Sequence, residues 1–174
     1  MEKYQRLIEQ LASKKDSFIY NNSGKEHAQI VLGTLFKYAE KEIRMATGNL
    51  SDAVLDNPNV INNLQSFLAK GGTIKVILDD YNKNGDSKLL RLLQVYQLIS
   101  ESEGVIVKKF NKEKKFTSDS GQIHFTTVDN SMYRLETDTT NFKASGSFNN
   151  TAVTQNLNKK FEEVFSNENL TQPI

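Results

Sequence analysis

The sequence predicts an α/β fold, and two observations support this prediction. Hydrophobic residues switch repeatedly between the spacing of a helix, every three or four positions, and short runs typical of a strand. The 174 residues, 37% of them hydrophobic, can bury one substantial core, and the chain contains no internal repeat, low-complexity tract or linker. We therefore expect a single domain over residues 1–174.

The first half of the chain is divided by glycine and proline. Pro58 starts a helix and the pair Gly71 and Gly72 ends it, because proline suits a first helical turn and glycine suits a helix end. The first helix carries one apolar stripe, from Tyr4 to Leu11, and is expected at the periphery. In chain order we predict a helix within 1–15, a strand at 18–20, a helix at 27–42, a strand at 43–47, the helix that begins at Pro58 and a strand at 73–78.

The second half continues the alternation. A helical stripe ends near Gly104, and runs with the spacing of a strand follow it. Two of the later runs are separated by few residues, which favours a hairpin. We predict a helix at 89–99, strands at 105–107 and 123–128, a hairpin of strands at 132–136 and 142–147, and a last helix at 152–165.

Composition excludes several classes of function. The chain has 22 Lys and Arg against 21 Asp and Glu, so its net charge of +1 gives no bulk attraction to nucleic acid or membrane. It has no Cys, which excludes disulfides, thiolate metal sites and cysteine nucleophiles. The amino terminus lacks the apolar core of a signal peptide, and no run approaches the length of a membrane span. We expect a cytoplasmic protein without a metal or a cofactor.

The most specific pattern lies in segments 122–129 and 146–149. The first reads Gln-Ile-His-Phe-Thr-Thr-Val-Asp and the second Gly-Ser-Phe-Asn. This spacing resembles the phospholipase D superfamily, whose members carry H-x-K-x4-D followed by G-S-x-N. With Asp129 on the family's aspartate, the family's histidine falls on Gln122 and its lysine on His124.

The resemblance extends over about residues 30–165 and is closest to the small single-motif bacterial endonucleases. It implies an α/β/α sandwich with a mixed central sheet. In those proteins one chain supplies half of the site, so the resemblance also implies a two-fold homodimer. It implies phosphate-binding roles for Gln122, His124, Ser147 and Asn149, and catalytic roles for His124 and Asp129.

The departures from the family pattern affect catalysis. The family's histidine attacks phosphorus and its lysine holds the phosphate. The amide of Gln122 is not nucleophilic and has no titratable proton. His124 supplies less charge than lysine unless a carboxylate such as Asp129 raises its pKa. Sixteen residues (130–145) separate Asp129 from Gly146, a longer segment than in the family.

Simpler roles stay open for the same residues. His124 is also explained as a hydrogen-bonded strand histidine, Gln122 as a surface residue and Asp129 as a turn residue. Ser147 and Asn149 are also explained as caps of the last helix, with Asn149 or Thr151 at the N-cap. If the phosphate role holds, an anion binds beside His124 at the start of that helix.

Two further groups offer binding chemistry. Strand alternation puts Arg134 and Glu136 on one face, where they form either an exposed ion pair or a rebuilt acid/base site with His124. The segment 108–116 interleaves five lysines with two phenylalanines, which suits phosphate contact and base stacking, although solvated lysines beside a core strand explain it too. Its candidate ligands are Lys112, Lys114 and Lys115.

Three classes of function therefore remain. The first is a phospholipase D-like module that binds a phosphodiester, most simply nucleic acid, without the usual catalysis. The second is an active nuclease or phosphodiesterase in which His124 acts with Asp129 or Glu136 and with Arg134. The third is a regulatory or protein-interaction subunit of a bacterial nucleic-acid-processing or defence system, which uses the helix at 4–11 to bind a protein partner.

Overall fold

In a computed structural model, the described residues are 1–50, 54–81, 87–99, 104–112 and 114–174. Within them, eight strands form one mixed sheet in the order β1-β9-β8-β7-β2-β3-β4-β10. Neighbours β2, β3 and β4 are parallel, and every other neighbouring pair is antiparallel. The strands of this sheet are β1 (Tyr20–Asn22), β2 (Glu42–Thr47), β3 (Thr73–Leu78), β4 (Val105–Phe110), β7 (His124–Val128), β8 (Met132–Asp138), β9 (Lys143–Ser147) and β10 (Thr171–Pro173).

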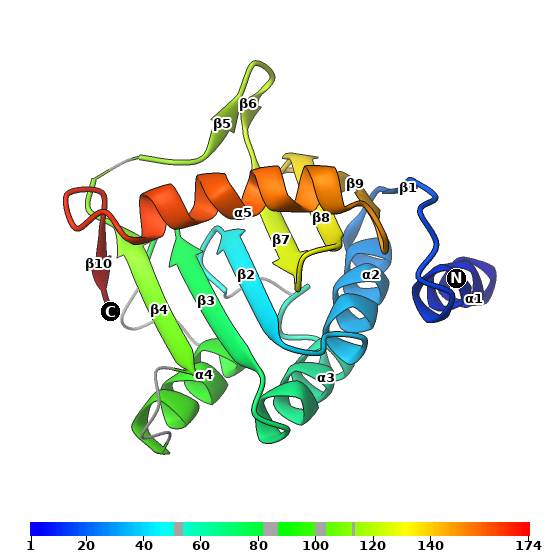
Figure 1. Cartoon of the computed structure of the whole chain (residues 1–174), viewed down its shortest axis with the longest axis horizontal. Helices are drawn as coiled ribbons and strands as arrows, with labels where there is room; N and C mark the ends of the chain where they lie inside the picture. Colours follow the sequence, from blue (N-terminus) through cyan, green and yellow to red (C-terminus); the bar gives the residue numbers. More distant parts are fainter. Residues whose placement is uncertain (51–53, 82–86, 100–103, 113) are drawn as a thin grey trace.

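Helices cover both faces of the sheet, as the α/β/α prediction requires. Figure 1 shows α5 crossing one face, with α2, α3 and α4 on the other and α1 beside α2. A small hairpin of β5 (Thr117–Ser118) and β6 (Gly121–Gln122) projects from the sheet before β7. The helices are α1 (Glu2–Ser13), α2 (Lys25–Lys37), α3 (Pro58–Ala69), α4 (Lys88–Ile99) and α5 (Thr151–Phe165).

The sheet separates two hydrophobic cores. Central strands carry buried apolar side chains on both faces, which is typical of strands covered by helices on both sides. On one face, side chains such as Met45 and Val76 pack with the helices α2 to α4. On the other face, Ile77 and Phe125 pack against Phe161 of α5. Glu162 of α5 adds ion pairs to the strands, 2.7 Å to Arg44 and 3.0 Å to Lys75.

The predicted order of elements is confirmed, with differences at the boundaries. The strand predicted at 73–78 is β3 as observed. The helix predicted at 27–42 ends earlier, at Lys37, because the backbone N–H groups of Glu40 and Lys41 donate to the Asp129 carboxylate and turn the chain into β2. The first strand is 20–22 instead of 18–20, since it is Tyr20 that becomes buried, against β9.

Three strands were not predicted. The strands β5 and β6 have two residues each, all of them exposed except the half-buried Gln122, so they lack an alternating apolar pattern. β10 pairs with β4 at the sheet edge and contains Pro173, a residue that lowers strand propensity. No helix among the described residues combines the length and the apolar character that a bilayer span requires.

The register of β7, β8 and β9 defines two ends of the sheet. At one end, where β7 begins, His124 pairs with Glu136; we name this the His124 end. At the other, Thr127 pairs with Tyr133, which pairs with Ser147; we name this the Ser147 end. Three residues of strand separate these rows, or about 10 Å.

Candidate functional site

The strongest cluster of chemically active side chains lies at the His124 end. The parallel strands β2 and β3 finish here, so that Asp79 directly follows β3 and Gly48 directly follows β2. A Cβ on Gly48 would lie 3.7 Å from the His124 ring. In open α/β sheets, ligands bind outside the carboxyl ends of the parallel strands. The location therefore favours a binding site.

His124 is held between two carboxylates. Its Nε2 lies 2.8 Å from Asp79 Oδ2 and its Nδ1 lies 3.2 Å from Glu136 Oε1. Burial lowers the pKa of His124, but hydrogen bonds to Asp79 and Glu136 outweigh it and raise the pKa to about 9. His124 is thus a cation at neutral pH, and both of its N–H groups are already hydrogen-bonded.

Gln122 is hydrogen-bonded to the Asp79 carboxylate. Its Nε2 donates to Asp79 Oδ2 at 2.6 Å, and its Oε1 accepts from Lys115 Nζ at 3.3 Å. The amide nitrogen lies 3.1 Å from His124 Nε2 because both groups donate to one oxygen. The pair predicted from the sequence is therefore brought together, but as two hydrogen-bond donors around Asp79.

Arg134 and Glu136 extend the cluster into the protein. Arg134 Nη2 lies 2.6 Å from Glu136 Oε2, and Arg134 Nε donates to Asn22 Oδ1 at 3.1 Å. Both side chains are only 5–6% exposed. The interpretation as an exposed ion pair is wrong, because β8 is an inner strand with neighbours on both sides. The structure does bring Arg134, Glu136 and His124 together, as the rebuilt-site alternative requires.

Asp129 lies at the Ser147 end and does not orient His124. Its carboxylate accepts three backbone N–H groups, from Glu40, Lys41 and Glu42, at 2.8–3.0 Å. It also occupies the left-handed region, with φ of 52°, at the turn between β7 and β8. The expectation that Asp129 raises the pKa of His124 is wrong; Asp79 and Glu136 do so. The structure gives Asp129 a turn role.

The Gly-Ser-Phe-Asn segment also lies at the Ser147 end, where it makes structural contacts. A Cβ on Gly146 would meet Tyr20 Oη and Tyr133 O at 2.3 Å, so the glycine makes room for the Tyr20 ring. Ser147 is fully buried, and its Oγ accepts from the N–H of Asn149 at 3.2 Å. Asn149 itself is exposed.

The start of α5 differs from the sequence prediction too. Its N-cap is Asn150, not Asn149 or Thr151, and the Asn150 side chain accepts from Val153 N at 3.1 Å. Asn150 N donates to Ser131 O in the turn after β7, which places the helix start at the Ser147 end. The helix start and His124 therefore lie at opposite ends of these strands, and the anion site expected beside both stays a prediction.

The lysine-rich segment is divided between surface and core. Lys112, Lys114 and Lys115 are exposed near the β5–β6 hairpin, and Lys115 contacts Gln122. Phe116 packs edge-on against Phe110 and Phe125 beneath α5. The expectation that phenylalanines of this segment stack on bases is wrong, since the core uses both of them.

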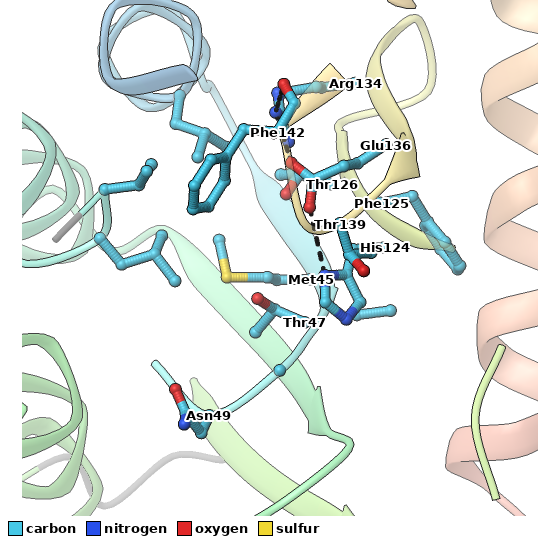
Figure 2. Close-up of a pocket in the computed structure, with 15 residues that line it drawn as sticks. Met45, Thr47, Asn49, His124, Phe125, Thr126, Arg134, Glu136, Thr139 and Phe142 are labelled. Carbon is cyan, nitrogen blue, oxygen red and sulfur yellow. Dashed lines mark hydrogen bonds and ion pairs between the residues drawn. The ribbon is translucent and has the colours of Figure 1, made fainter. Parts of the chain in front are cut away.

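A cavity of about 130 Å³ opens beside His124. Figure 2 shows Phe142 and Met45 on one side and the polar chains of Arg134, Glu136 and His124 on the other. Its remaining wall combines aliphatic side chains with threonine hydroxyls. Within the described ranges, no group of three or more His, Asp or Glu side chains is arranged to hold a metal ion.

Asp79 is the central residue that the sequence analysis did not assign. It accepts from both Gln122 and His124, and its side chain is only 5% exposed. One signal was available, because an acidic residue directly follows a buried parallel strand, where α/β proteins place functional groups. Its pairing with residues more than forty positions away is a tertiary contact that no local pattern reveals.

Comparisons with solved structures identify the fold. The phospholipase D family member Nuc from Salmonella typhimurium superposes with a TM-score of 0.59 and 12% identity, over 91% of this chain and 99% of Nuc. NucT from Helicobacter pylori gives 0.54 and 12%, over 84% and 95%. Phosphatidylserine synthase from Haemophilus influenzae gives 0.61 and 11%, over 90% of this chain and 39% of the synthase.

The chain thus has the phospholipase D fold. TrmBL2, an archaeal chromatin protein described with a novel mode of DNA binding, is also similar, with a TM-score of 0.58 and 16% identity over 99% of this chain and 61% of that protein. No family model and no curated protein sequence matches.

Proposed function

We propose that the protein is a phospholipase D-like module that binds nucleic acid and has lost the superfamily's usual phosphodiesterase chemistry. The single observation that carries the proposal is the state of His124. It is a clamped cation between Asp79 and Glu136, and no free imidazole nitrogen faces a substrate.

The expected loss of catalysis follows from what a nucleophilic histidine requires. A nucleophilic histidine needs a neutral nitrogen with an accessible lone pair. The pKa of His124, raised to about 9, leaves it protonated at neutral pH, and the neighbouring Gln122 has no nucleophile. Two carboxylates beside His124 also repel an incoming phosphate.

Binding is assigned to the lysines next to this end of the sheet. Lys112, Lys114 and Lys115 are exposed, and Lys115 reaches Gln122 at the edge of the charged cluster. Lysines near one another neutralise successive phosphates and release counterions. The DNA binding described for TrmBL2, of which 61% is similar in structure to this chain, adds support.

The test of binding is the salt dependence of affinity for single-stranded DNA and RNA. Replacing Lys112, Lys114 and Lys115 together by alanine should reduce the slope of log affinity against log salt by about two to three units. The matched control replaces Lys3, Lys14 and Lys25, which are exposed on α1 and α2 and change the net charge equally. If both triple variants reduced the salt slope equally, the binding surface could not be assigned to Lys112, Lys114 and Lys115.

The test of catalysis is cleavage of bis-p-nitrophenyl phosphate and of fluorescent DNA and RNA in the presence of a chelator. We expect negligible turnover, and Gln122→His alone should not restore it fully, because catalytic groups act as a unit. Robust wild-type turnover that His124→Ala abolishes would contradict the proposal.

That result would favour the second candidate, a rebuilt enzyme. The specific observation behind it is the buried chain Asp79–His124–Glu136–Arg134, since a histidine oriented by carboxylates is typical of acid/base sites.

The proposal also includes a two-fold homodimer, supported by the half-site character of similar single-motif chains. Sedimentation that shows only monomer at micromolar concentration would instead favour a different protein partner.

A further inference from the structure

The cavity beside His124 has the size of one ring and the chemistry of a heteroaromatic base. Its volume is about 130 Å³. An engineered protein cavity of about 150 Å³ accommodates benzene. The space therefore suits a single planar ring, and the rest of a larger ligand would lie outside the cavity.

The cavity wall is apolar on one side. Leu32, Met45 and Leu55 contribute aliphatic surface, and the Phe142 ring closes the space between them and the strands. Phe142 has a φ of 53°, in the region that favours glycine. Its carbonyl accepts from Asn22 Nδ2 at 2.8 Å and from Arg134 Nη2 at 3.4 Å, which fixes this conformation.

The opposite wall is polar, and one of its groups lacks a partner. Thr126 is 4% exposed and pairs with Arg134 across β7 and β8, on the same face as His124. In the described part of the chain, no hydrogen bond satisfies its hydroxyl, yet that oxygen is not sealed from solvent. It therefore opens into the cavity, where a ligand can donate to it or accept from it.

The charges around the cavity select an uncharged ligand. His124 and Arg134 carry two positive charges, and Asp79 and Glu136 carry two negative ones, all in close ion pairs. The cluster has no net charge to attract a phosphate. A neutral ring with hydrogen-bonding edges matches both walls, and a nucleobase is such a ring.

We propose that this cavity binds one unstacked nucleobase of a single strand, while the lysines beside the β5–β6 hairpin hold the phosphates. The inference rests on the proposed nucleic-acid function and names the part of the ligand that this site takes. Proteins recognise single strands by splayed bases placed against aromatic side chains, with hydrogen bonds to the base edges.

The first experiment uses free nucleosides. Met45 lines the cavity, whereas Met132 lies at the Ser147 end, so ¹³C-methyl methionine NMR carries its own control. Adenosine, guanosine, cytidine and uridine are titrated beside ribose 5-phosphate and inorganic phosphate. We expect cytidine or uridine, whose bases are single rings, to shift the Met45 methyl signal more than the two-ring purine nucleosides do, and the two phosphates to leave it unchanged.

The second experiment narrows the cavity without removing a polar group. A Cβ at Gly48 meets only the His124 ring, at 3.7 Å, so Gly48→Ala and then Gly48→Val fill the space progressively. Gly33→Ala in α2 is the matched control, since its Cβ meets Asn63 Nδ2 at 3.7 Å away from the cavity. The Gly48 variants should lose the nucleoside response, and Gly48→Val should weaken single-strand binding by about tenfold.

A third variant removes the open hydroxyl. Thr126→Val keeps the side-chain shape and should lower nucleoside affinity roughly three- to tenfold, the effect of one hydrogen bond. No Met45 shift with any nucleoside, or an equal shift with phosphate, would overturn the base pocket. If single strands still bind through the lysines in that case, the proposed function survives; if nucleosides shift Met45 but no strand binds, the proposed function fails alone.

Discussion

The two ends of strands β7 to β9 use their residues in opposite ways. At the His124 end, Asp79, His124, Glu136 and Arg134 form a buried chain of charges beside a cavity. At the Ser147 end, the segment that resembles a family motif fills space and satisfies backbone groups. The motif is thus divided: Gln122 and His124 lie with the ionisable cluster at one end, whereas Asp129, Ser147 and Asn149 lie at the other.

The difference arises from the length of the segment between Asp129 and Gly146. β8 returns along β7 until Glu136 stands beside His124, and β9 then runs back toward the turn. Each antiparallel strand reverses direction, so one additional strand transfers the next segment to the opposite end of the sheet. The residues placed beside His124 are consequently those of β8 and the loop after it.

Of the substitutions that compare the two ends, replacement of Arg134 at the His124 end should lower the free energy of unfolding most. Arg134→Ala leaves Glu136 with His124 as its remaining cationic partner among the described residues, so the cost should lie near the lower end of the about 3–5 kcal/mol of a broken buried ion pair. Urea denaturation of wild type and variant gives the free energy of unfolding. The double variant Arg134→Met with Glu136→Leu should lose less free energy of unfolding than Arg134→Ala. An equal loss would show that the two side chains are not coupled.

A second effect appears with pH. The pKa of His124 is 6.5 in an unfolded chain and about 9 in the fold, so the contribution of its ion pairs is complete below pH 6.5 and disappears as pH rises through 9. The free energy of unfolding should fall by about 3 kcal/mol more in wild type than in His124→Gln over this range. NMR titration of the His124 ring gives the pKa directly, and a midpoint below 7 would contradict the clamp.

At the Ser147 end, a single methyl group should be costly. Gly146→Ala forces a Cβ against Tyr133 O and Tyr20 Oη at 2.3 Å, and the backbone oxygen cannot move aside. Overpacking of this kind costs about 1–3 kcal/mol. Gly33→Ala, in a helix with room for the methyl group, should be neutral or stabilising. Thermal unfolding of both variants tests this, and a neutral Gly146→Ala would remove the packing explanation.

The sequence predicted what depends on local patterns. β3 was delimited correctly because a buried run lies between Gly72 and Asp79. Strand alternation placed Arg134 and Glu136 on one face, where both line the cavity with His124. The sequence analysis missed features that depend on tertiary contacts. These are the role of Asp79 and the position of Ser147 relative to His124.

The phosphate role expected for Asn149 stays a prediction, but the structure places Asn149 at the Ser147 end and not beside His124, for the same reason. A four-residue motif specifies a turn that leads into a helix, and this turn is present. Its distance from His124 depends on how many strands precede it, and the motif itself contains no such information. The family resemblance therefore predicted the fold, but it could not specify how far apart the two parts of the motif lie.

The smallest effect distinguishes the two ends most directly. Asn149 is exposed and its side chain makes no hydrogen bond among the described residues, so Asn149→Ala should change the free energy of unfolding by less than about 0.5 kcal/mol. Asn150→Ala, one residue further, removes the N-cap of α5 and should cost about 1 kcal/mol. Single-strand affinity and its salt dependence should be unchanged in Asn149→Ala, because the ligand is expected at the His124 end. A fall in affinity without a fall in stability would return the phosphate site to the Ser147 end.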